Sequence, residues 1–261
     1  MEKSRQAMTT NRTLLFNRLE VKYWVDRTTR TALTRDLLAF MRPDTHSSSE
    51  EGYLVRSIYY DTHDYMAYHE KLSGAALRHK LRSRAYGENP GDSKLVRFEV
   101  KSRYLTYIYK TTVDIPRADY DEVDFALKRR LLLPARLMND ARVSKEFFRL
   151  QRQYNMIPKV LIQYRRQAFE RNETSRVRAN FDDELCASSN LDLLGPLKGA
   201  RRLQQYNRAI FEIKVDGHLP FWMHQLISKY NLQSQAISKY CYGVRSEAKM
   251  SANGRPEEYV N

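Results

Sequence analysis

Glycine is scarce in this chain, with nine residues among 261. Neither GxGxxG nor GxxxxGK followed by Ser or Thr occurs in the sequence. These are the glycine-rich loops with which Rossmann and P-loop proteins hold phosphate through backbone amides. Any phosphate bound by this protein would therefore be held by side chains.

Cysteine and long apolar runs are also lacking. Cys186 and Cys241 are too few for a disulfide framework, and no CxxC or HxxxH spacing suggests zinc. Residues 1–13 have no apolar stretch after their charges, so no secretory signal is visible. No run approaches the roughly 18 apolar residues of a membrane span. We therefore predict a cytoplasmic protein with reduced thiols and without a membrane span.

Acidic residues are outnumbered, 31 against 45 Lys and Arg, which gives a net charge of +14. This excess favours an anionic partner: nucleic acid, an anionic membrane surface or a phosphate-rich small molecule. The hydrophobic fraction of 42% is enough for a core. We see no clean linker and predict one domain over residues 15–246, with a flexible arm at 1–14 and a flexible tail at 247–261.

Eight segments rich in Val, Ile, Tyr, Phe and Thr predict strands, and most are separated by short turns, which implies antiparallel pairing. They are residues 19–25, 53–61, 76–86, 95–104, 107–115, 159–169, 176–182 and 209–215. Four segments with helical periodicity are residues 28–41, 119–133, 142–155 and 220–230. Residues 186–206 read as an irregular connection. The sequence thus predicts an α+β fold dominated by antiparallel sheet.

The strand segments share a charge pattern, seen first in KLRSRAYG (80–87). Because side chains alternate along a strand, Lys80, Arg82 and Arg84 lie on one face. Six other segments also have one basic and one mostly apolar face. Two architectures fit this pattern. The basic faces lie on an open sheet, in water or against nucleic acid, or they line a closed barrel of about eight strands that holds a small anion.

A set of short motifs carries a resemblance to a known family. The motifs are KYWV (22–25), SIYYDT (57–62), KLRSRAYG (80–87), FEVK (98–101), YRRQAF (164–169), RVRANFDDEL (176–185), FEIK (211–214) and SKYCYG (238–243). They occur in the same order in VTC-domain polyphosphate polymerases, which belong with the CYTH phosphatases to the triphosphate tunnel metalloenzyme superfamily. The chain resembles this family from about residue 16 to 245. The resemblance implies a closed antiparallel β-barrel tunnel with a basic interior and helices packed outside.

The resemblance also implies an activity. It is the transfer of the ATP γ-phosphate to a growing inorganic polyphosphate chain, with Mn²⁺ or Mg²⁺, by a free-standing, bacterial-type member. Alternatives in the same tunnel are an inorganic tripolyphosphatase or nucleoside triphosphatase and a non-catalytic polyphosphate-binding module. ATP and polyphosphate are the expected partners. The ordered motifs argue against nucleic acid. A separate membrane protein as partner follows only from the resemblance, and the oligomeric state is not predicted.

Site residues follow from the motifs one by one. The resemblance implies catalytic roles for eight cations, substrate-binding roles for four residues and a metal-binding carboxylate. The catalytic set is Lys22, Arg82, Arg84, Lys101, Lys110, Arg166, Arg178 and Lys239; the substrate-binding set is Lys80, Tyr164, Lys214 and Ser238; the metal ligand is Glu212. Phosphoryl transfer needs mainly positioning and charge stabilisation, which suits such a set and requires no protein nucleophile.

Two departures from the family pattern are visible. Superfamily phosphatases often begin with ExExK, whereas this chain has Arg18 at the first position, which weakens the case for a rich metal site and for hydrolysis. Some eukaryotic polymerases have a lysine where this chain has Ala236. Product binding at the tunnel exit could therefore differ.

Several residues keep two interpretations. Glu20 and Glu99 either neutralise nearby cations inside the barrel or serve the site directly. Arg103 and Arg176, near strand ends, either bind phosphate or are solvated surface charges. Asp61 reads as the cap of a turn. Asp182 and Asp183 either form a turn or join the acidic side of the site.

Overall fold

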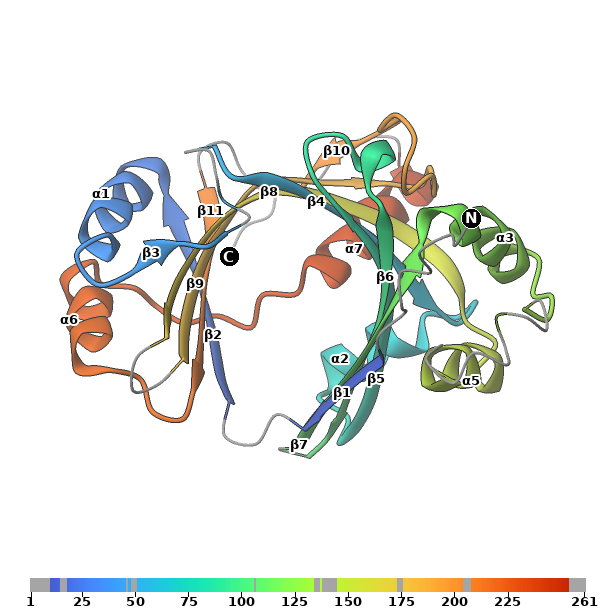
Figure 1. The fold of residues 1–261 in the computed structure, drawn as a ribbon, viewed down its shortest axis with the longest axis horizontal. Helices are drawn as coiled ribbons and strands as arrows, with labels where there is room; N and C mark the ends of the chain where they lie inside the picture. Colours follow the sequence, from blue (N-terminus) through green and yellow to red (C-terminus); the bar gives the residue numbers. More distant parts are fainter. Residues whose placement is uncertain are drawn as a thin grey trace, which may run out of the picture.

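The computed structural model of the protein describes residues 10–14, 18–45, 47, 51–105, 107–133, 137, 145–172, 176–203 and 208–253. The fold is α+β, and the described residues form a single antiparallel sheet of eleven strands (Figure 1). Within the described part of the chain, no helix combines the length and the apolar character that a membrane crossing requires.

The sheet curls into an arch. Its hydrogen-bonded order is β1-β7-β6-β5-β4-β8-β9-β11-β2, with the two-residue strands β3 and β10 attached to β8 and β9. The bounds are β1 Thr10–Leu14, β2 Arg18–Asp26, β3 Arg42–Pro43, β4 Tyr53–Asp61, β5 Leu77–Tyr86, β6 Leu95–Tyr104, β7 Tyr107–Pro116, β8 Ile157–Asn172, β9 Arg176–Ser188, β10 Arg201–Arg202 and β11 Arg208–Asp216. All eight strands that the sequence predicts are present, because their alternating, β-branched segments each bury one face.

Six helices and one 3-10 turn accompany the sheet in the described residues. They are α1 Arg27–Leu37, α2 Met66–Ser73, η1 Pro90–Asp92, α3 Arg117–Lys128, α5 Lys145–Gln153, α6 Phe221–Lys229 and α7 Lys239–Asn253. The four predicted helices correspond to α1, α3, α5 and α6, although each ends earlier than expected. Asp26 starts α1 by accepting the Thr29 amide at 2.7 Å, as an N-cap does. Helices α2 and α7 were not predicted from the sequence.

Two apolar cores cover the outer face of the arch. One joins β4–β7 to α3 and α5, with Val123 and Phe147 in the same cluster as Phe98. The other joins β2, β9 and β11 to α1 and α6, with Leu33 and Met223 in the same cluster as Phe211. Figure 1 shows these helix pairs outside the two arms of the arch. These helices lie outside the sheet, as expected.

Helix α7 corrects that expectation, because it packs against the inner, concave face. Its residues Tyr240 and Val244 belong to a third core together with Val160 and Ile162 of β8. Gly243 allows the close approach: a Cβ there would lie 2.4 Å from Ile162 Cδ1. Figure 1 shows α7 beneath the arch. Part of the concave face, along β8, is therefore apolar and covered by a helix.

The closed barrel is a second expectation that the structure corrects. The strand order ends at β1 and β2, and no ladder joins these two strands in the described residues. Helix α7 packs against β8 and β9 in the middle of the sheet, and the sheet curls over it. Side chains bridge the two arms instead: Lys101 of β6 lies 3.0 Å from Glu20 of β2.

The chain ends and the expected irregular connection also take a different form. Residues 10–14, expected in the N-terminal arm, form β1 and pair with β7. Helix α7 continues to Asn253, past the expected start of the tail. Strand β9 continues to Ser188, beyond the start of the expected connection. Cys186 and Cys241 are both free thiols.

Candidate functional site

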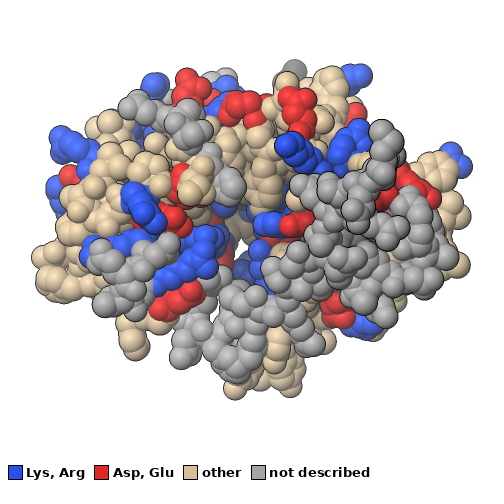
Figure 2. Space-filling model, viewed as in Figure 1, with Lys and Arg blue, Asp and Glu red and all other residues tan. Residues whose placement is uncertain are grey.

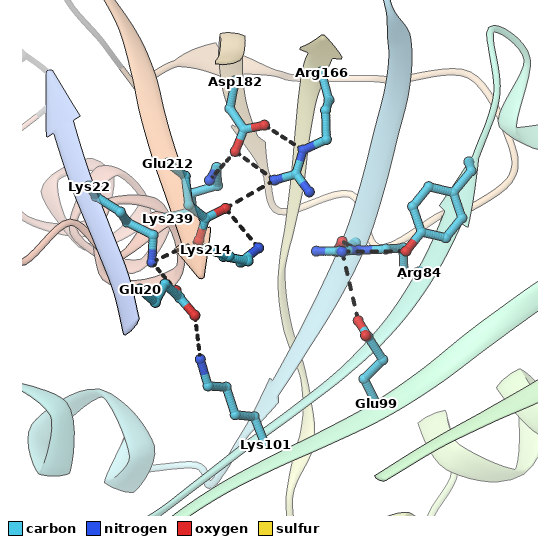
Figure 3. Close-up of polar contacts among 12 residues, drawn as sticks. Glu20, Lys22, Arg84, Glu99, Lys101, Arg166, Asp182, Glu212, Lys214 and Lys239 are labelled. Atoms are coloured by element: carbon cyan, nitrogen blue, oxygen red, sulfur yellow. Dashed lines mark hydrogen bonds and ion pairs between the residues drawn. The ribbon is translucent and has the colours of Figure 1, made fainter. Parts of the chain in front are cut away.

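The charged part of the concave face is the candidate site. We call inner face the side of the sheet that carries Lys22 of β2, Arg82 of β5 and Lys101 of β6, the side to which α7 also packs. Figure 2 shows a hollow in the middle of the molecule with Lys and Arg in its walls. The alternation in the sequence placed the cations of these strands on one face, and their mutual contacts agree with that placement (Figure 3).

Three lysines stand directly opposite one another in neighbouring strands. Lys80 of β5 is in register with Lys101 of β6, which is in register with Lys110 of β7. Like charges in cross-strand register destabilise a sheet. Lys101 and Lys110 reach carboxylates, Glu20 at 3.0 Å and Glu99 at 2.5 Å. Lys80 contacts only a hydroxyl among the described residues. Such a row is an arrangement that an anionic ligand would stabilise.

Glu99 of β6 gathers the cations of one arm. Its carboxylate accepts Arg82 Nε at 2.5 Å and lies 3.8 Å from Arg84 Nη1, besides its contact with Lys110. Burial would raise the pKa of Glu99, but these three cations together lower it well below the ordinary value. Glu99 is therefore ionised, and it neutralises part of this cluster, as one of our two interpretations held.

Glu20 and Glu212 gather the cations of the opposite arm. Lys22 Nζ lies 2.6 Å from Glu20 and 3.3 Å from Glu212, and Lys214 Nζ lies 3.1 Å from Glu212. Burial and the charge of Glu212 would raise the pKa of Glu20, but Lys22, Lys101 and Lys214 lower it to about 2. Burial would likewise raise the pKa of Glu212, but the surrounding cations, Lys214 and Lys22 first, lower it well below the ordinary value. Both carboxylates are thus ionised at neutral pH, and Glu20 also contacts Lys101 across the gap (Figure 3).

Asp182 completes the network and resolves an open question. It is fully buried in β9, accepts Arg166 in a two-pronged contact of 2.6 and 2.8 Å, and lies 2.5 Å from Lys239. No turn occurs at Asp182, because β9 continues through it. A bulge between β8 and β9 at residues 163–165 precedes the point where Arg166 pairs with Asp182. Asp183 points elsewhere and pairs with Arg30 at 2.8 Å.

Tyrosine rings lie beneath the cations. Tyr164 is only 1% exposed, and both Lys239 and Arg166 lie over its ring, at 4.8 and 5.2 Å from the centroid. This burial favours a positioning role for Tyr164 over direct substrate contact. Tyr59 accepts a hydrogen bond from Arg82 at 3.3 Å. Burial raises its pKa, but Arg82, Arg84 and Lys239 lower it to about 8.

The start of α7 brings Ser238 and Lys239 to the site. Ser238 Oγ accepts the amide of Cys241 and lies 3.4 Å from Lys80 Nζ. The next residue, Tyr240, donates a short hydrogen bond to buried Asp61. Asp61 also accepts the backbone amide of Thr62 and two amides in the first turn of α2, so it caps a turn as predicted and in addition anchors α7.

The structure brings twelve of the thirteen predicted site residues into this region, and Arg178 is the exception. Arg178 is in register with Lys214, but its side chain is 45% exposed and lies 3.9 Å from Glu170. Arg103 and Arg176 are exposed. The side chain of Arg18 lies outside the described residues.

The sequence left Asp182 open between a turn and the acidic side of the site. The signal was available, because the same alternation that selects Arg178 in RVRANFDD also places Asp182 on the inner face. Tyr59, by contrast, was not predicted from the sequence. It is in register with Arg82 and hence shares its face, but the pairing of the two strands was not known from the sequence.

The fit of a divalent cation rests on Glu20 and Glu212. Within the described residues, no group of three or more His, Cys, Asp or Glu side chains converges on one point. The oxygens of Glu20 and Glu212 nevertheless converge on the Lys22 ammonium, which already occupies the position of a cation between them. Mg²⁺ in phosphate-handling sites commonly uses one or two carboxylates with substrate oxygens and water. These residues therefore fit such an ion.

Binding of a polyanion should weaken above pH 8. Burial is the main cause that lowers the pKa of both Lys80 and Lys214 to about 8, from an ordinary 10.5. Between about pH 8 and 10.5 the unfolded chain binds more protons, so the free energy of unfolding should rise with pH while anion affinity falls. Tripolyphosphate affinity, measured from pH 7 to 9, should fall more steeply in the wild type than in Lys80→Arg/Lys214→Arg, which stays charged. Equal slopes would contradict this assignment.

The chain matches a known protein family. A family model described as VTC domain matches residues 17–248. No curated protein sequence matches the chain.

Solved structures resemble the chain at low identity. A candidate adenylate cyclase from Bacillus halodurans has a TM-score of 0.48 at 14% identity, covering 85% of this chain and 96% of its own. A Pyrococcus horikoshii protein has a TM-score of 0.43 at 10% identity, covering 90% and 99%. A candidate adenylyl cyclase from Hippeastrum, with a dominant triphosphatase activity, has a TM-score of 0.43 at 11% identity, covering 87% and 96%.

Proposed function

The chain belongs to the VTC-domain family, and from this premise we propose that it is a metal-dependent polyphosphate polymerase. In this proposal, the γ-phosphate of ATP is transferred to the end of an inorganic polyphosphate chain held against the inner face. The proposal goes beyond family membership, since the same face could also serve hydrolysis or binding alone.

The proposal rests on an excess of positive charge on the inner face. The network has nine cations and four carboxylates, and nine minus four leaves a surplus of five positive charges when every lysine is protonated. The cations are Lys22, Lys80, Arg82, Arg84, Lys101, Lys110, Arg166, Lys214 and Lys239; the carboxylates are Glu20, Glu99, Asp182 and Glu212. Gathering unbalanced charge in a partly buried space is costly unless an anion compensates it. A polyphosphate chain supplies several negative charges in a line.

The arginines and lysines of the inner face differ in how they can bind phosphate. Arg82 and Arg84 offer planar guanidinium groups that can take two phosphate oxygens at once. Lys101 and Lys239 act as point charges from opposite sides of the gap. Phosphoryl transfer places its growing charge on the equatorial oxygens, where such cations stabilise it. The attacking group is itself a phosphate oxygen, so no base is required of the protein.

A divalent cation would be held by Glu212 and Glu20 together with phosphate oxygens. When bound, Mn²⁺ or Mg²⁺ supplies additional neutralisation of charge on the phosphates being transferred. Phosphates that pair with Lys22 and Lys214 would release the two carboxylates from these lysines. In this proposal, the carboxylates of Glu20 and Glu212 pair with the lysines when substrate is absent. They would bind the metal ion when substrate is present.

The polymerase proposal predicts that ATP and Mn²⁺ yield a polyphosphate ladder. Purified protein would be incubated with both, and the product would be run on a gel stained for polyphosphate. The ladder should disappear on treatment with an exopolyphosphatase. It should also be absent with Glu212→Ala, which removes the carboxylate that Lys22, Lys214 and Arg166 share.

A matched control is Glu88→Ala, which removes a carboxylate that pairs with Arg165, away from the network. It should leave the ladder unchanged. Release of phosphate from tripolyphosphate without any ladder would overturn the polymerase in favour of a hydrolase. Tight binding of polyphosphate with neither product would favour a binding module.

A further inference from the structure

The turn between β6 and β7 exposes apolar side chains at the lower end of one arm of the arch (Figure 1). Tyr104, the last residue of β6, is directly opposite Tyr107 of β7 and, on its other side, Leu77 of β5. These three side chains are 46–55% exposed, and Leu105 in the turn is 53% exposed. Scattered exposed apolar residues are ordinary, but four neighbours form a patch. We call these four residues the hairpin tip.

Backbone contacts hold the hairpin tip in a fixed shape. The amide of Leu105 donates to the carbonyl of Ala76 at 2.8 Å, and Arg103 Nε donates to the carbonyl of Leu105 at 2.7 Å. Leu105 has φ of 52°, a left-handed conformation that glycine or asparagine adopts more easily than leucine. The turn itself therefore does not explain an exposed leucine at this position.

Two arginines lie directly behind the hairpin tip. Arg103 precedes Tyr104, Arg78 follows Leu77, and the two arginines are opposite one another in the β5–β6 ladder, about 3.4 Å along the strands from the tip. In the part of the chain that the structure describes, neither has a carboxylate oxygen within 4 Å, although the more distant charge of Glu70 reaches Arg78. Burial lowers the pKa of Arg78, and the positive charge of Arg103 lowers it further. An anion would stabilise this pair.

The size of the hairpin tip favours a membrane surface over a protein partner. Neighbouring strands are about 4.8 Å apart, so the ends of β5, β6 and β7 span only about 10 Å. Four side chains that are about half exposed supply at most about 500 Å², whereas a stable protein interface needs roughly 800 Å² from each partner. A membrane contact needs less area, because apolar side chains enter the lipid boundary and long cations behind them reach lipid phosphates. Tyrosine is enriched at this boundary.

We propose that the hairpin tip docks the protein on an anionic membrane surface, with Tyr104, Leu105 and Tyr107 at the boundary between lipid headgroups and acyl chains. Arg78 and Arg103 then bind the phosphate groups of the anionic lipids. The strands stand steeply on the membrane, and the rest of the molecule remains in water. This contact uses none of the residues assigned to phosphoryl transfer, so it is independent of the proposed function.

Cosedimentation with vesicles tests the docking. Purified protein would be mixed with vesicles of phosphatidylcholine alone or with about 30% phosphatidylserine, in about 0.1 M salt. The wild type should bind the anionic vesicles about tenfold more tightly than the neutral ones. Tyr104→Thr/Leu105→Asn, which suits the strand and the left-handed turn, should lose about tenfold in affinity for anionic vesicles. Arg78→Gln/Arg103→Gln should lose most of the preference for anionic lipid. Thermal unfolding would verify that both variants are folded.

Each double variant has a matched control on the outer helices. Leu38→Thr/Phe221→Thr removes two exposed apolar side chains from the ends of α1 and α6. Arg35→Gln/Arg129→Gln removes the same charge as the arginine variant from the ends of α1 and α3. Both controls should bind vesicles as the wild type does. Equal losses in a variant and its control would attribute binding to general apolar exposure or net charge, and would overturn the docking.

Three further outcomes would overturn the proposal. The first is a wild type that binds anionic vesicles no better than neutral ones. The second is displacement from anionic vesicles by saturating tripolyphosphate at constant ionic strength, which would assign the lipid contact to the inner face. The third is self-association without vesicle binding, abolished by Tyr104→Thr/Leu105→Asn, which would assign the hairpin tip to a second copy of the chain. Vesicle binding that requires the hairpin tip and persists with tripolyphosphate would support the docking.

Discussion

Replacing Arg82 or Lys239 by alanine should lower turnover about a thousandfold while the protein stays folded. Each residue stabilises phosphate charge in the proposed reaction, and each can be removed without isolating a buried carboxylate. Without Arg82, Glu99 keeps Lys110 at 2.5 Å and Arg84 at 3.8 Å. Without Lys239, Asp182 keeps both contacts to Arg166.

The measurement is initial velocity with ATP and Mn²⁺, together with phosphate release from tripolyphosphate, so that both candidate reactions are followed. Arg165→Ala is the matched control. Arg165 is the strand neighbour of Arg166, but its side chain pairs with Glu88 at 2.8 Å and does not join the network. It should retain activity close to that of the wild type. Full activity of both the Arg82 and the Lys239 variants would show that the inner face takes no part in the reaction.

Asp182→Ala should destabilise the fold by about 3–5 kcal/mol, the cost of breaking a fully buried ion pair. The substitution leaves Arg166 and Lys239 facing one another without the carboxylate that both contact. In a domain of this size the melting temperature should fall by roughly 10 °C. Added tripolyphosphate should restore part of the loss, because it binds the folded state and supplies the missing negative charge.

Asp183→Ala is the neighbouring control, expected to cost about 1 kcal/mol or less, since Asp183 and Arg30 are both partly exposed. The pH dependence gives a second check. Burial raises the pKa of Asp182, but Arg166 and Lys239 lower it to about 2, from an ordinary 3.8. Its contribution to stability is present above about pH 4 and is lost as pH falls toward 2. A wild type and an Asp182→Ala variant with equal melting temperatures at pH 7 would contradict this account.

The sequence predicted much of the candidate site because period-two alternation is a local property. KLRSR and FEVK place Arg82 and Lys101 on one face whatever the rest of the chain does. The same rule also assigns Asp182, but two consecutive aspartates resemble a turn, and only the paired partner strand shows that β9 continues. Arg178 illustrates the opposite limit. Alternation gives the face of Arg178 correctly. Its side chain nevertheless stays outside the network, because it lies near the end of β9 and close to Glu170.

Three features depended on tertiary structure alone. The expected barrel is an open arch with α7 on its concave face. The packing of this helix over Ile162 is a contact between segments about 80 residues apart. The sharing of Lys22 between Glu20 and Glu212 needs the pairing of β2 with β11. The meeting of Lys101 with Glu20 needs the curvature of the whole sheet. Charge, periodicity and motif order fixed which residues face inward, since these are properties of short segments. Which of them touch is decided by strand order and curvature, because the contacts that form the site join residues far apart in the chain.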